Sequence, residues 1–145
     1  MSIHYSQVKP LSEFTHDDCV AHINQHSSFL ELVPKRLICA ELCMLAVSKD
    51  GWALKFAPVA LIDEAMCKAA VTQCGWALEF VPTQFKTAEL CDAAVAKNAW
   101  ALEFVPDHLK TVDMVVTAMK EEEATILYLP DRMKDEVLEA LAKHA

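Results

Sequence analysis

Apolar residues along the chain recur with helical spacing in segments of about ten residues. In one such segment the apolar positions lie three and four residues apart, at Leu90, Cys91, Ala94 and Val95, which predicts an α-helix with one buried face. The side-chain oxygen of Thr87 can accept a bond from an N–H group of the first turn, so we expect the helix to start there. A second apolar segment, WALEFV at 76–81, predicts a shorter helix that stops before Pro82, because proline disfavours the α conformation in the residue before it.

This pattern returns every 24 residues. The prolines, all in one register, are Pro10, Pro34, Pro58, Pro82, Pro106 and Pro130. Trp52, Trp76 and Trp100 share the period, as do Cys19, Cys43, Cys67 and Cys91. Units counted from the residue after each proline are 11–34, 35–58, 59–82, 83–106 and 107–130, with half-units 1–10 and 131–145. Two short helices bury their apolar faces only when units stack. The sequence therefore predicts a single all-α domain, an α-solenoid of 24-residue helical-hairpin repeats.

The ends of the predicted helices have their own signals. The fifth place of each unit, where we expect the first helix to be capped, holds Thr15, Cys39, Asp63, Thr87, Thr111 and Asp135. Gly51 and Gly75 follow the first helix and fit a left-handed residue that terminates it.

These residues carry a resemblance to a known family. The segments Ala69 to Pro82 and Ala93 to Pro106 follow the pattern A-A-V-x-x-x-G-W-A-L-E-F-V-P, with Ala99 in the glycine place of the second. The pattern resembles the tandem repeats of the domain-of-unknown-function family 4116. The resemblance implies helical repeats of this length, found mainly in bacterial proteins, and it carries over no catalytic residues.

Polar residues replace apolar ones at the two ends of the array. The eighth and twelfth places are apolar in most units but are Asp18 and His22 in the first. The ninth and thirteenth places become Glu139 and Lys143 in the last. We infer that the first pair of places faces the preceding unit and the second pair faces the following unit, because terminal units need polar outer faces.

Composition excludes some functions. A net charge of −8 argues against binding nucleic acid, which needs a Lys/Arg surface. No apolar run approaches the ~20 residues that span a bilayer, and Met1 to Pro10 lack the pattern of a secretion signal. We expect a cytoplasmic, monomeric protein with free thiols and without a membrane anchor, cofactor or metal.

Candidate reactive residues have simpler structural interpretations. The cysteine row predicts buried, unpaired core thiols, because neighbouring helices stand ~8–10 Å apart and a disulfide needs Cα atoms within ~7 Å. The tryptophan row predicts core packing. Asp18, His22 and His26 share one helix face and could hold zinc, although a polar cap already explains the first two. No arrangement typical of an active site is present.

The leading hypothesis is a non-catalytic scaffold or adaptor that binds a protein partner. Two rows of places predicted to be exposed are candidate contacts. The tenth place gives Val20, Met44 and Lys68, and the second helix gives Glu31, Lys55, Glu79 and Glu103. One alternative is an acidic inhibitor that mimics nucleic acid. Another is a metal or redox sensor that uses the His-rich first unit and Cys39.

Overall fold

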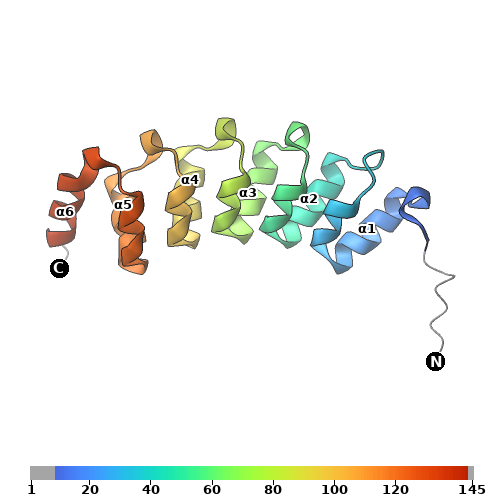
Figure 1. Ribbon diagram of the computed structural model, residues 1–145, viewed down its shortest axis with the longest axis horizontal. Helices are drawn as coiled ribbons and strands as arrows, with labels where there is room; N and C mark the ends of the chain where they lie inside the picture. Colours follow the sequence, from blue (N-terminus) through green and yellow to red (C-terminus); the bar gives the residue numbers. More distant parts are fainter. Residues whose placement is uncertain (1–8, 144–145) are drawn as a thin grey trace, which may run out of the picture.

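The computed structural model describes residues 9–143, and within that range the chain forms helices and no strand. Six α-helices of ten residues each provide one layer of the array (Figure 1). They are α1 (His16–Gln25), α2 (Ala40–Lys49), α3 (Glu64–Gln73), α4 (Ala88–Lys97), α5 (Val112–Glu121) and α6 (Lys134–Lys143). The predicted all-α fold is confirmed.

The second helix of each hairpin is a 3-10 helix. The six-residue members are η3 (Ser27–Leu32), η4 (Gly51–Phe56), η6 (Gly75–Phe80), η8 (Ala99–Phe104) and η10 (Glu123–Tyr128). Short turns of the same type, which we did not predict, follow five of the prolines. They are η2 (Leu11–Glu13), η5 (Val59–Leu61), η7 (Thr83–Phe85), η9 (Asp107–Leu109) and η11 (Asp131–Met133).

The predicted helix caps are confirmed at four positions. The side chains of Thr15, Asp63, Thr87 and Thr111 each accept a hydrogen bond from the backbone N–H three residues later. Cys39 occupies the same place before α2, but its side chain makes no capping bond. The prediction for Asp135 is wrong, because α6 begins one residue earlier, at Lys134. The last α-helix therefore follows directly on η11, without a threonine or aspartate in the place before it.

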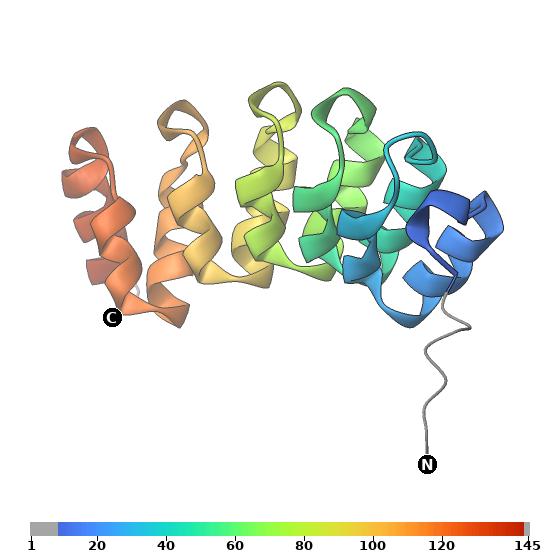
Figure 2. The ribbon, with the colours of Figure 1, turned by 45° about the vertical axis from the view of Figure 1, so that its right-hand side comes forward.

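The hairpins stack side by side in single file (Figures 1 and 2). Helices α2 to α5 each contact the neighbouring α-helices, the 3-10 helix of their own unit and the 3-10 helix of the preceding unit. In α3 the inward residues Met66, Cys67, Ala70 and Val71 are at most 1% exposed. The core is therefore a continuous strip between the two helical layers.

The two glycines act through space and not through a left-handed backbone. Neither has a positive φ, so the predicted role in terminating the α-helix is wrong, and both residues instead begin a 3-10 helix. A Cβ atom on Gly51 would lie 2.3 Å from the carbonyl oxygen of Ala70, and one on Gly75 would lie 2.4 Å from that of Ala94. Glycine is needed because the next unit's α-helix approaches the backbone here.

This contact also supports the inferred direction of the helix faces. Ala70 occupies the twelfth place of its unit, and its backbone lies against Gly51 of the preceding unit. At the array ends, His22, Glu139 and Lys143 are exposed and Asp18 is half-buried, in agreement with polar outer faces. Residues 1–8 of the predicted half-unit 1–10 lie outside the described residues.

Candidate functional site

An aromatic ladder runs along the layer of 3-10 helices. Each tryptophan lies near the aromatic ring that ends the 3-10 helix of the following unit. The ring centroids are 5.8 Å apart for Trp52 and Phe80, 5.7 Å for Trp76 and Phe104, and 6.4 Å for Trp100 and Tyr128. These separations are typical of attractive aromatic pairs. The ladder therefore links successive units outside the aliphatic core.

The prediction that the tryptophans pack in the core is wrong. Trp52 is 41% exposed, and Trp76 and Trp100 are half-buried. In a 3-10 helix residues three apart lie on one face, so Gly51 and Leu54 share the buried face. Each tryptophan instead shares a face with the exposed residue three positions later.

That shared face joins the tryptophans to one of the two predicted contact rows. Its charged members are Lys55, Glu79 and Glu103, each three residues after a tryptophan, and all are exposed. We call the three tryptophans and these three charged residues, together with Phe56, Phe80, Phe104 and Tyr128, the ladder face. Glu31 occupies the equivalent exposed place in the first unit, where Ser28 replaces tryptophan.

Charge and aromatic surface already meet within the ladder face. The ammonium of Lys55 lies 4.7 Å from the ring centroid of Phe56, which is within the range of a cation–π contact. In the next two units glutamates stand where Lys55 does. Burial and the Glu103 carboxylate together raise the pKa of Tyr128. Glu79 and Glu103 thus place carboxylates where the earlier unit has Lys55. The ladder face itself supplies no cation next to Phe80 or Phe104 that corresponds to Lys55 next to Phe56.

Two lysine side chains bind the backbone at the last aromatic residues of the ladder, Phe104 and Tyr128. Lys86 donates a hydrogen bond from Nζ to the backbone oxygen of Phe104 at 3.0 Å, and Lys110 donates to that of Tyr128 at 2.9 Å. Burial lowers the pKa of Lys86, and Lys110 also pairs with Asp107. The sequence signal that we missed was a charge in a place that is Ile38 and Ile62 in the earlier units.

The tenth-place row is less exposed than its pattern predicted. Val20 and Met44 are half-buried and pack against the core, whereas Lys68 is exposed and pairs with Glu64 at 2.9 Å. In the fifth unit the same place is Val116, which is 6% exposed. The row is therefore only partly a solvent-facing surface.

Asp18, His22 and His26, the candidate zinc ligands for which the sequence favoured a polar cap, have different surroundings. Asp18 completes a capping box with Thr15 and pairs with Lys9, and these hydrogen bonds hold the pKa of its carboxyl well below the usual range. The ring of His22 lies 5.0 Å from that of Phe14 and 4.7 Å from that of Phe29. His26 is exposed after the end of α1. These contacts place Asp18 and His22 in the N-terminal cap.

A different cluster of metal-ligating side chains lies between the first two units. The ligand atoms of His16, Cys39 and Glu41 all lie within 4.8 Å of one another. Cys39 Sγ is 3.8 Å from His16 Nε2, and that nitrogen is 3.8 Å from a carboxylate oxygen of Glu41. Among residues 9–143 this is the one group that combines three such ligands. The sequence pointed to the His-rich first unit and to Cys39 as parts of a metal or redox sensor, but its spacing did not pair them, because the ligands come from two units.

The cysteine row is buried as predicted. Cys19, Cys43, Cys67 and Cys91 are each 0% exposed and unpaired, whereas Cys39 and Cys74 are half-buried. Burial raises the pKa of Cys43 and of Cys67 to about 11 and also raises those of Cys19 and Cys91. The row thiols therefore stay protonated at neutral pH and act as small apolar side chains.

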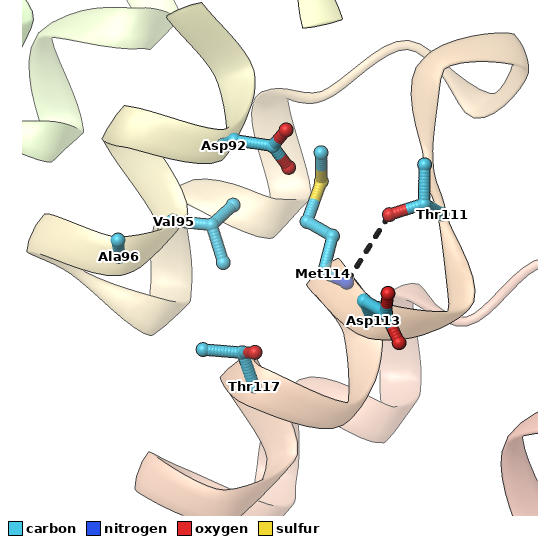
Figure 3. A pocket seen from close by; sticks show the side chains of 7 residues that line it. All are labelled: Asp92, Val95, Ala96, Thr111, Asp113, Met114 and Thr117. Carbon is cyan, nitrogen blue, oxygen red and sulfur yellow. Dashed lines mark hydrogen bonds between the residues drawn. The ribbon is translucent and has the colours of Figure 1, made fainter. Parts of the chain in front are cut away.

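A groove opens between α4 and α5 on the layer of α-helices (Figure 3). It has a volume of about 460 Å³ and is lined by Asp92, Val95, Ala96, Thr111, Asp113, Met114 and Thr117. Thr111 Oγ1 already accepts the capping bond from the Met114 N–H at 3.2 Å. The groove contains exposed carboxylates and small side chains, and its shape follows from the stacking of the two helices.

No helix within residues 9–143 combines the length and the apolar character needed to cross a bilayer.

Comparison with known proteins identifies the repeat. The model of the family described as "Domain of unknown function (DUF4116)" matches residues 39–86 and again residues 63–110. No curated protein and no solved structure matches the chain. The second match starts 24 residues after the first, in agreement with the period of the prolines and tryptophans. The chain is thus a tandem helical repeat that resembles the family DUF4116.

Proposed function

We propose that the array is a non-catalytic protein-binding scaffold whose ladder face binds an extended segment rich in lysine or arginine. The observation that carries this proposal is the juxtaposition of half-buried rings with exposed Glu79 and Glu103 on one continuous face. Stacked repeats commonly bind partners through equivalent places of successive units.

The contact between Lys55 and Phe56 supports the chemistry of the partner. It places a cation over a ring of the ladder face within the chain itself. In the following units Glu79 and Glu103 occupy the place of Lys55, so a cation above Phe80 or Phe104 would have to come from a partner. Such a cation would gain ~0.5–2 kcal/mol from the ring and a further attraction from the adjacent carboxylate.

The buried thiols and the side chains that cap the α-helices are engaged in structure. The thiols of the cysteine row form the core, and the oxygens of Thr15, Asp63, Thr87 and Thr111 cap helices. The net charge of −8 favours a basic partner. The tenth-place row, Val20, Met44 and Lys68, is the second candidate contact, because Lys68 and parts of its neighbours remain accessible.

A synthetic peptide of alternating lysine and serine tests the proposal, with the intrinsic tryptophan emission as the signal. The change of Glu79 and Glu103 to lysine should weaken binding at least tenfold, which corresponds to ~1.4 kcal/mol. The matched control changes Asp92 and Asp113 to lysine on the other layer and alters net charge equally. Equal weakening in both variants, or no binding by the unmodified chain, contradicts the proposal.

A further inference from the structure

In the cluster of His16, Cys39 and Glu41, the histidine and the cysteine are residue types that no other unit has at the equivalent place. Cys39 stands where the following units have Asp63, Thr87 and Thr111, all of which cap an α-helix. His16 stands in the next place of the preceding unit, which holds Ala40, Glu64, Ala88 and Val112 in the following units. The stacking of α1 on α2 brings the two unusual side chains to 3.8 Å between Sγ and Nε2.

The atoms that meet are suitable metal ligands. Imidazole nitrogen, thiolate and carboxylate are the three donor types that bind zinc, with bonds of ~2.0–2.3 Å. Tetrahedral bonds of that length place ligand atoms ~3.3–3.8 Å apart, close to the 3.8 Å found for two of the pairs. The Glu41 side chain is 79% exposed and that of His16 is 40% exposed, so small movements can close the site around an ion.

The surroundings of His16 favour coordination through Nε2. The other ring nitrogen, Nδ1, lies 3.9 Å from a carboxylate oxygen of Asp17. This separation is too long for a hydrogen bond, so Asp17 acts on the ring only through its negative charge, while Nε2 faces Cys39 and Glu41. The side chain of Cys39, free of a capping bond, is available to the ion.

We propose that His16, Cys39 and Glu41 form a binding site for a divalent transition metal of the zinc class, held between the first two units. The three residues supply one ligand each, and water completes the coordination. Binding is coupled to the stacking of α1 on α2 because the ligands come from both units. Thiol coordination releases one proton from Cys39 to solvent, so affinity rises with pH.

Other units of the repeat show which residues can replace the three proposed ligands. Cys39→Thr, His16→Ala and Glu41→Ala each install the residue found at the equivalent place of another unit, namely Thr87, Ala40 and Ala65. We expect all three to fold. Each should weaken Zn²⁺ binding, measured by calorimetry on the full chain, by at least tenfold. The controls His22→Ala and Cys74→Ser should leave Zn²⁺ affinity unchanged.

Cobalt provides a readout that identifies the thiolate. Addition of Co²⁺ to the full chain should produce a thiolate-to-metal charge-transfer band that saturates at one ion per chain. The band should disappear in Cys39→Thr and persist in Cys74→Ser. Absence of the band from the unmodified chain overturns the proposal, as does a band that survives Cys39→Thr.

Discussion

Two interfaces between successive units differ at one equivalent residue, which is glycine in one and alanine in the other. Between α2 and α3, Gly51 allows the backbone of Ala70 to approach, and a Cβ atom there would meet the Ala70 oxygen at 2.3 Å. Between α4 and α5 the equivalent residue is Ala99, which has that Cβ atom and is 6% exposed. The α4–α5 groove has a volume of about 460 Å³, against about 260 Å³ for the corresponding groove between α3 and α4, where Gly75 is present.

We infer that one side-chain carbon contributes to the wider groove at the α4–α5 step. Burial of the inward residues does not separate the two steps, because Leu90 at the Gly75 step is 6% exposed and Met114 at the Ala99 step is 4% exposed. The equivalent residues of the two preceding units are Gly51 and Gly75. We therefore expect Ala99 to hold α5 farther from η8 than glycine would, an effect that appears in the groove and not in the burial of the core.

The largest expected effect comes from removal of the close approach. Gly51→Ala has no conformational penalty, because φ is not positive at this residue, but its Cβ atom forces α3 away from η4. Overpacking of this kind costs ~1–3 kcal/mol, which we expect as a loss in the free energy of unfolding by urea. A variant as stable as the unmodified chain would show that α3 moves away without cost, and the spacing argument would fail.

Alkaline pH should affect the closely stacked region next. The pKa values of Cys43 and Cys67 are raised from 9.0 to about 11, so the folded state favours the protonated thiol. Their contribution to stability is complete below pH 9 and is lost as the pH rises through 11. We expect the thermal midpoint to fall across this window.

Replacement of single thiols locates the alkaline effect. Cys67→Ala should lower stability at neutral pH through the cavity that it leaves, while its midpoint should fall less steeply between pH 9 and 11. Cys74→Ser, at a half-buried thiol outside the row, is the control. An unchanged pH profile in Cys67→Ala would mean that other groups cause the alkaline loss.

The sequence predicted most of what is decided within one unit, and it missed several features that depend on the contact between units or on the type of the second helix. Thr87 caps α4 through a bond three residues away, so local pattern was sufficient. Gly51 was misassigned because the reason for its small size is the backbone of Ala70 in the next unit. Trp52 was misassigned because a 3-10 helix has three residues per turn, and the apolar pattern alone did not distinguish this helix from a short α-helix.

The same limit applies to the candidate sites. The exposed row of Glu79 and Glu103 was predicted from the period, but its contact with the aromatic ladder depends on how successive units stack. Likewise, Asp18 and His22 share one helix, whereas the contact of His16 with Cys39 joins two successive units. Periodicity identifies equivalent places, and only the stacking geometry shows which places become neighbours.

The smallest expected effect reverses the first substitution. Ala99→Gly removes the Cβ atom that separates α4 from α5 and should let the two helices approach as α2 and α3 do. Glycine also increases the conformational entropy of the unfolded chain, at ~0.4–1 kcal/mol, so the net change in stability should be within ~1 kcal/mol. Hydrogen exchange provides the sharper measurement, because closer stacking should slow amide exchange in α5 relative to α3. Ala65→Gly, an exposed position near the start of α3, carries the same entropic cost without a change in stacking. If exchange in α5 is as fast in Ala99→Gly as in this control, the wider groove has another origin, and the alanine only fills a space that the stacking had already left.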